Sequence, residues 1–526
     1  MLGMANRIKK FTLLVILTAF CCANCTTDAF AITSRAKVKK QNNKIEVKKH
    51  DEHDEHEELF KKAFVEKNDI LSITDCVSIA FHNSPVIKKY KYNLDLAQSN
   101  VGIAKSEYFP VISAGIGFYN NNHSFGEEYH SHVMEFPDVA VTINKLVYNF
   151  GKTTAYIKME EFYKIGAEYE FIDSLCETLF DVKEKYYKVL LAKSRMEVVK
   201  KDFELNEEFL DMAEKLATKN STRISDISSA RFNYNVSRVR YLQAVNDFEN
   251  AKIDLNNAMF VEKPEPYEIE STSTYSYNNE FIDNETSKEF IPEELPFDEK
   301  NAAEIAYKNS PDLKVLIATF KAMEQSLNYI KRTYFPDLKA GVGYGYYKNN
   351  HLKGDNSLQV GVTLDSSVNL MNLKHSIKGA DAQLNIADNE IVLFKKNLYF
   401  KVQRALTDLK KAELEFPICQ VATANAYTHL KIVMDDYKND KEDYVALQSA
   451  RTAYQTSLNN YIDALYKYNI ALINVERAMH CHLIDIHHKS KHAIHYHNDE
   501  LLKHITKWMN CDEKEKRKSI RKEYRL

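Results

Sequence analysis

Two stretches of the chain alternate apolar residues with small or polar ones. Residues 111–118 are followed by a polar turn and by residues 139–143, and residues 338–346 are followed in the same way by residues 360–364. Side chains of a strand point alternately to opposite faces, so a period of two is typical of strands with two different faces. The pattern therefore predicts two hairpins.

Most of the remaining chain has a helical pattern. Residues 152–219 and 380–438 contain almost no glycine or proline, and each is followed by a segment in which apolar and small residues recur every three or four positions. The first seam is Ile227, Ala230, Tyr234, Ser237, Tyr241, Ala244, Phe248, Ala251, Leu255 and Ala258. The second is Leu447, Ala450, Tyr454, Ser457, Tyr461, Ala464, Tyr468, Ala471, Val475 and Ala478. An ordinary core stripe explains one such helix equally well, but two matching seams favour a bundle of duplicated helical hairpins.

The two sets of elements are copies of each other. Residues 79–117 and 305–343 share Asn-Ser-Pro, Tyr-Phe-Pro and Ala-x-Gly-x-Gly in the same order, and residues 229–259 align without gaps with residues 449–479 through a shared Ser-Ala-Arg. The period is far longer than the 20 to 50 residues of solenoid repeats. Each copy is therefore half of a duplicated protein.

Prolines and serines predict where some helices begin and end. Ser84 and Ser310 each precede a proline and are expected to cap helices of about 23 residues that run to Pro110 and Pro336. Pro417 lies inside the second long helical segment. We expect it to kink or interrupt that helix.

The N-terminus has the plan of a secretory signal peptide. Basic residues are followed by an apolar run and by Ala29-Phe30-Ala31, which predicts cleavage after Ala31. Lipidation of Cys21, Cys22 or Cys25 is a less favoured alternative. No later stretch approaches 18 consecutive apolar residues, so any contact with a bilayer must be made by strands.

The resulting domain plan has six parts. They are a signal peptide (residues 1–31), an acidic, histidine-containing segment (32–71), a first repeat (72–260), a bridge (261–298), a second repeat (299–483), and a tail that is histidine-rich and then basic (484–526). The net charge of -3 is too balanced to indicate a nucleic-acid partner.

Four strands cannot form a closed membrane barrel, because the smallest use about eight, and an open sheet in lipid leaves its edges unsatisfied. Either the hairpins form a soluble sheet or several chains share one barrel. The order of hairpins, helical hairpins and motifs over residues 72–483 resembles the TolC-type outer-membrane efflux protein family.

That resemblance implies a mainly α fold with a membrane β-barrel. A homotrimer would form a 12-stranded barrel in outer-membrane lipid and a helical tunnel across the periplasm. It would work with a periplasmic adaptor and an inner-membrane transporter in efflux or type I secretion. The alternative is a periplasmic coiled-coil scaffold or adaptor, which has no need of strand hairpins at one end of its helices.

The resemblance also implies a gate at the tips of the helical hairpins. Asp226 and Tyr437 match an aspartate and a tyrosine that latch the closed aperture in the family. Three departures occur nearby: Glu442 replaces the latch arginine, and Ala446 and Ser449 replace the acids of the pore constriction. The candidate aperture acids of this chain are Asp440, Glu442 and Asp443. The alternative is that these acids are solvated turn residues.

Metal, redox and catalytic roles are not favoured. Histidine with carboxylate is a ligand set for transition metals. The histidines cluster in two places, His50, His53 and His56, and then His480, His482, His487, His488, His492, His495 and His497. Neither cluster has the spacing of a tetrahedral site, so we expect solvated tails, with weak metal binding as the alternative.

Cysteines and catalytic motifs add little. The cysteines left after cleavage are Cys76, Cys176, Cys419, Cys481 and Cys511. Without closely spaced pairs they do not predict a disulfide framework, although one bridge is possible. No nucleophile elbow, phosphate loop or paired-acid site is present, so we expect neither a cofactor nor an enzyme.

Overall fold

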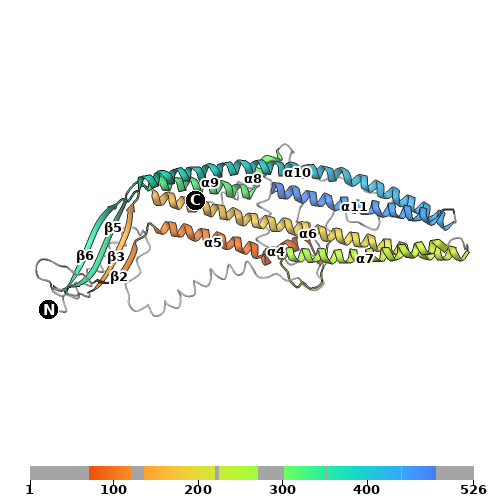
Figure 1. Cartoon of the computed structure of the whole chain (residues 1–526), viewed down its shortest axis with the longest axis horizontal. Helices are drawn as coiled ribbons and strands as arrows, with labels where there is room; N and C mark the ends of the chain where they lie inside the picture. The colour runs from red at the N-terminus through yellow and green to blue at the C-terminus, as the bar shows by residue number, and fades with distance from the viewer. Residues whose placement is uncertain are drawn as a thin grey trace, which may run out of the picture. The chain divides into compact units, whose positions relative to one another are not determined.

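The computed structural model describes residues 70–119, 136–219, 224–270, 301–349, 352–439 and 441–480. The chain divides into one unit of residues 1–61 and a second of residues 62–526, and all described residues belong to the second (Figure 1). The polar turns of the strand hairpins, Asp440 and the tail beyond His480 lie outside the described residues.

Two serine-capped helices begin where the sequence predicts. α5 (Pro85–Ser106) and α9 (Pro311–Arg332) follow the short helices α4 (Ile73–Asn83) and α8 (Ala302–Asn309). The Ser84 and Ser310 hydroxyls each accept a backbone N–H three residues on, at 3.3 Å. Both helices end four residues before the expected proline, because a turn intervenes in which the N–H groups of Phe109 and Phe335 bond to the last helical carbonyls at 2.9 and 3.1 Å.

Two very long helices run through the described unit. α6 (Lys152–Lys219) has 68 residues and α10 (Leu370–Lys438) has 69, which corresponds to about 100 Å each at 1.5 Å per residue. α10 begins ten residues earlier than expected, because the Asn369 side chain accepts the N–H groups of Met371 and Asn372 at 3.1 Å.

Pro417 does not interrupt α10, so that part of the prediction is wrong. Proline removes one helical hydrogen bond. Its neighbour Phe416 is buried and packs against Tyr461, with ring centroids 5.3 Å apart. Tertiary packing next to the proline therefore holds the helix together across the missing bond.

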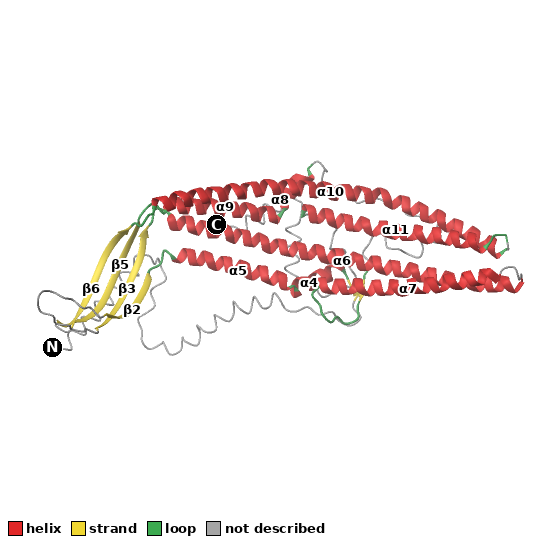
Figure 2. Cartoon of the chain, viewed as in Figure 1, coloured by secondary structure: helices red, strands yellow, loops and turns green. Residues whose placement is uncertain are grey.

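Returning helices complete two helical hairpins (Figure 2). α7 (Ile224–Ala258) packs along α6, and α11 (Tyr444–Met479) packs along α10, as the seams predicted. The α11 seam is buried almost throughout, whereas the α7 seam is largely half-buried. The difference arises because α11 also packs against α6, while α7 has α6 as its principal neighbour among the described helices.

A four-stranded antiparallel sheet contains one hairpin from each repeat. Its strands are β2 (Val111–Tyr119), β3 (Phe136–Tyr148), β5 (Asp337–Asn349) and β6 (Leu352–Asp365), in the order β2-β3-β5-β6. The predicted hairpins are confirmed, and pairing of β3 with β5 joins the two repeats. Among the described strands, β2 and β6 form the edges.

A second, small sheet lies beside the helices. β1 (Ile70–Leu71) and β4 (Glu268–Ile269) pair in parallel. The Tyr186 hydroxyl of α6 donates to the backbone carbonyls of Leu71 and Glu270. This fully buried phenol thus ties both strands to the first long helix.

Candidate functional site

The two faces of the four-stranded sheet differ in chemistry. One row of paired residues crosses all four strands on one face, and it consists of Ile112, Ile143, Val342 and Val360. The next row, on the opposite face, consists of Ser113, Thr142, Gly343 and Gln359. Successive side chains alternate between faces. The sheet therefore has one apolar face and one face of small and polar residues.

The apolar face is exposed rather than packed on a core. Ile112 is 69% exposed on β2, and Val360 is 72% exposed on β6. Along β6, Leu358, Val362 and Leu364 are exposed in the same way. A soluble antiparallel sheet turns its apolar face to the core, and a contiguous exposed apolar surface marks a membrane or protein contact. Among the described helices, none is long and apolar enough to cross a membrane.

The two predicted latch residues lie near the hairpin tips and share a neighbour. Asp226 is half-buried in the first turn of α7, and Tyr437 is fully buried at the end of α10. The Tyr437 ring meets the Tyr444 ring edge-on, with centroids 6.1 Å apart. Burial raises the pKa of the Tyr444 phenol, and the negative charge of Asp226 raises it further. Tyr444 thus contacts Tyr437 and is influenced by the charge of Asp226.

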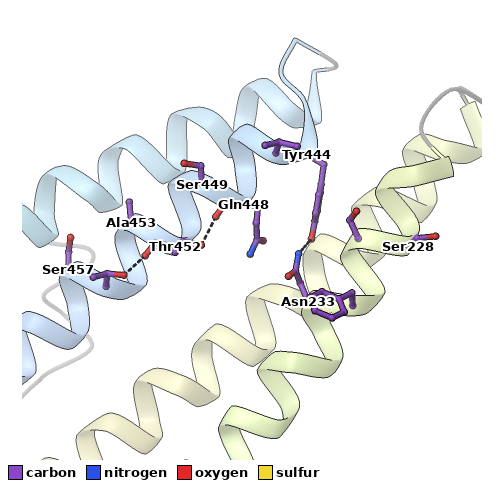
Figure 3. A pocket seen from close by; sticks show the side chains of 12 residues that line it. Ser228, Asn233, Tyr444, Gln448, Ser449, Thr452, Ala453 and Ser457 are labelled. Atoms are coloured by element: carbon purple, nitrogen blue, oxygen red, sulfur yellow. Dashed lines mark hydrogen bonds between the residues drawn. The ribbon is translucent and has the colours of Figure 1, made fainter.

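Tyr444 also makes the direct contact between the two hairpins at this end. The Asn233 amide of α7 donates to the Tyr444 hydroxyl at 3.2 Å (Figure 3). Neither residue was a candidate from the sequence. One signal was available in the sequence, because an aromatic residue stands immediately after the predicted turn. A solvated loop does not need an aromatic side chain there.

The candidate aperture acids have different surroundings. Asp443 is the N-cap of α11, and its carboxylate accepts the Ala446 N–H at 2.8 Å. Glu442 is exposed beside it. Asp440 lies outside the described residues. Capping of α11 is enough to explain an aspartate at position 443. Its role at the aperture therefore stays a prediction.

A groove of about 980 Å³ lies between α7 and α11 near the tips (Figure 3). Tyr444 and Phe232 supply aromatic surface, and much of the remaining wall consists of serine, threonine and alanine side chains. The Thr452 and Thr456 hydroxyls each bond at 2.8 Å to a carbonyl four residues earlier in α11. These hydroxyls are thereby satisfied within their own helix.

A buried polar network joins the two hairpins above the tips. Arg451 of α11 donates to both carboxylate oxygens of Asp202 in α6, at 2.9 and 3.2 Å, and to Asn206 at 2.8 Å. Further along the same helices, Lys183 and Glu476 form a fully buried ion pair at 2.6 Å. The sequence showed Arg451 only as part of a repeated Ser-Ala-Arg motif, without its partners.

One histidine of the tail cluster was wrongly assigned to a solvated tail. His480 ends α11, is 3% exposed, and has its Nε2 atom 3.8 Å from Asp173. The other clustered histidines lie outside the described residues. Within the described ranges, no group of three His, Cys, Asp or Glu residues is arranged to hold a metal ion. Cys76, Cys176 and Cys419 are free thiols, and burial raises the pKa of each.

Comparisons with solved structures show the fold. The outer-membrane channel OprN matches with a TM-score of 0.64 and 13% identity over 80% of this chain and 94% of its own. The Campylobacter jejuni CmeC outer membrane channel matches with 0.64 and 13% over 77% and 85%. The Neisseria gonorrhoeae MtrE outer membrane channel, in its open state, matches with 0.61 and 13% over 77% and 88%.

Sequence comparison identifies the family. No curated protein is similar enough to count as a match. The family model described as outer membrane efflux protein matches residues 76–259 and 302–479, which are the two structural repeats without the bridge between them. The chain therefore belongs to the outer membrane efflux protein family.

Proposed function

We propose that the chain is an outer-membrane channel-tunnel that carries substrates out of the periplasm as a homotrimer. The observation that carries this proposal is the pair of rows across the sheet. Ile112, Ile143, Val342 and Val360 suit contact with lipid, and Ser113, Thr142, Gly343 and Gln359 suit a water-filled lumen. Transmembrane barrels alternate apolar outward residues with polar inward residues in this way.

The number of strands supports a trimer. The described sheet ends at β2 and β6, and an unpaired strand edge in lipid is unfavourable by several kcal/mol per polar group. Three copies would pair β6 of one chain with β2 of the next and close a barrel of 12 strands, with every edge satisfied. This closure requires a heterologous, ring-forming interface.

The helical hairpins supply the periplasmic part. Helices of 68 and 69 residues reach about 100 Å, which suits a tunnel that meets a periplasmic adaptor and an inner-membrane transporter. Asp226 and Tyr437 would hold the tip aperture closed through their shared neighbour Tyr444, and Asp440, Glu442 and Asp443 would supply negative charge at its rim. The chain acts as a passage and does no chemistry on its cargo.

Planar-bilayer recording and gel analysis of the purified mature protein test this function. We expect discrete conductance steps and a trimer band that is lost on heating in detergent. A periplasmic coiled-coil scaffold would instead be soluble without detergent and would give no conductance. That result would overturn the channel proposal.

A further inference from the structure

His480 is a buried histidine without a hydrogen bond. It follows α11 directly and adopts a left-handed backbone conformation with a φ of 50°. Its side chain is 3% exposed, and neither ring nitrogen has a hydrogen-bond partner within the described ranges. Buried polar atoms in proteins are nearly always hydrogen-bonded. The unpartnered imidazole is therefore a place where a change of charge state would alter the interactions of the protein.

A carboxylate lies just beyond hydrogen-bond distance of the imidazole. The Nε2 atom of His480 is 3.8 Å from Oδ1 of Asp173 on α6, and the ring meets the Phe180 ring edge-on with centroids 6.4 Å apart. A hydrogen bond from nitrogen to oxygen spans about 2.7 to 3.2 Å. At the observed separation the neutral ring makes no such bond. An imidazolium at the same position would be attracted to the carboxylate, and an approach of about 1 Å would give a charge-assisted hydrogen bond.

Charged groups from five helices lie around this pair. They are Lys89 of α5, Glu170, Asp173 and Glu177 of α6, Asp312 and Lys314 of α9, Lys401 of α10, and Arg477 of α11. Glu476 of α11 is neutralised by Lys183 at 2.6 Å. α8 also packs on the end of α11, through the uncharged Ala302 and Ala306. The balance between these acids and bases decides whether a positive charge on His480 is favourable.

The bases in this set are exposed or are held by other groups. Arg477 forms ion pairs with two glutamates of α6, at 3.5 and 3.3 Å. The Lys314 ammonium lies over an aromatic ring of α6, 5.3 Å from its centroid. Lys89 and Lys401 are exposed. The positive charges of these bases are therefore screened by solvent or offset by other partners.

The acids beside His480 lack an equivalent partner. In the part of the chain that the structure describes, His480 is the one ion-pair neighbour of Asp173. Burial raises the pKa values of the Glu170 and Asp312 carboxyls, and the negative charge of Asp173 raises both further. One more positive charge, placed on the imidazole, would offset the repulsion among these three carboxylates.

We propose that His480 is a pH-sensitive clamp. The imidazole takes up a proton from solvent and pairs with Asp173, which fastens the end of α11 to α6. Imidazole is the side chain that ordinarily changes charge between about pH 5 and pH 8. In the neutral state the ring contributes packing against Phe180 but no ion pair. The clamp goes beyond the channel function and does not depend on it.

Melting temperatures at two pH values test the clamp. An ion pair that exists only in the folded protein adds stability where the imidazole is charged, so this contribution should grow between about pH 8 and pH 6. We expect the purified protein to gain about 2 °C or more over His480→Gln across this interval. His429→Gln, at an exposed histidine of α10, is the matched control and should follow the unmodified protein. In an Asp173→Asn background, the same comparison should show no gain, because the partner is absent.

Hydrogen exchange tests the clamp without any substitution. After correction for the intrinsic pH dependence of exchange, the amides of residues 474–480 should exchange about threefold more slowly at about pH 6 than at about pH 8. Residues 420–426, about 30 Å along α10 from Lys401, are the internal reference. Equal exchange at both pH values, equal melting profiles for the unmodified protein and His480→Gln, or a gain that persists in Asp173→Asn would each overturn the clamp. None of these outcomes bears on the channel proposal, because neither measurement depends on conductance.

Discussion

Arg451 and Asp202 meet in a bidentate ion pair that is nearly inaccessible to solvent, with side chains only 4% and 1% exposed. They lie 249 positions apart in the sequence and hold together helices from different repeats. The contact therefore ties the two helical hairpins of one chain to each other above the tips.

Removing one member of this pair should destabilise the protein strongly. Asp202→Ala leaves the buried guanidinium without its counterion, and we expect a loss of about 3 to 5 kcal/mol. The more exposed pair Arg195 and Asp463 is the matched control on the same two helices. Asp463→Ala should cost no more than about 1 kcal/mol. Urea denaturation followed by circular dichroism measures both, and equal losses would contradict a special role for the buried pair.

The two faces of the sheet predict opposite outcomes for adjacent substitutions. Val360→Arg places a charge on the apolar face and should reduce trimer insertion, with a penalty of about 2 to 4 kcal/mol near the bilayer midplane. Gln359→Arg places the same charge on the other face of the same strand and should insert normally. Quantifying heat-labile trimer in outer-membrane fractions distinguishes them. Equal yields would show that the apolar face does not contact lipid.

The sequence predicted features that depend on local pattern. Ser84 and Ser310 cap helices because a serine hydroxyl reaches an N–H three residues on, and the strands were visible as a period of two. The Arg451 network was not predictable, because nothing near Arg451 in sequence indicates that Asp202 will lie opposite. The contact between Tyr444 and Asn233 was not predictable for the same reason. Pro417 was misjudged because local rules omit the packing that holds a helix across a missing bond.

The carboxyl of Glu170 on α6 predicts how the stability of the protein changes with pH. Burial, together with the nearby charge of Asp173, raises the pKa of the Glu170 carboxyl. A carboxyl whose pKa is raised by folding destabilises the folded state when ionised, so stability should rise as pH falls through the folded pKa. Glu170→Gln should therefore raise the melting temperature at about pH 8 and raise it less at about pH 5, because the folded carboxyl binds its proton at a higher pH than the unfolded one. An effect of equal size at both values would show that ionisation is not the cause.

The proposed latch predicts a change in gating without a change in assembly. Tyr437 is fully buried at the end of α10 against the ring of Tyr444, and Asp226 lies in the first turn of α7. A hydrogen bond to a carboxylate contributes about 1.5 to 3 kcal/mol when shielded from water. We propose that a hydrogen bond from Tyr437 to Asp226 forms in each copy of the closed trimer, and that these three bonds hold a closed state that a transporter partner releases.

Combining Tyr437→Phe with Asp226→Ala should therefore raise single-channel conductance in planar bilayers and leave trimer yield unchanged. The phenylalanine keeps the ring against Tyr444 and removes only the hydroxyl, so the change reports the polar contact rather than the packing. Asp211→Ala, at an exposed site on α6, is the control for loss of one negative charge. Unchanged conductance in the double variant, together with conductance raised by Glu442→Gln or Asp443→Asn, would contradict the latch. It would indicate that the turn before α11, rather than the latch pair, controls the aperture.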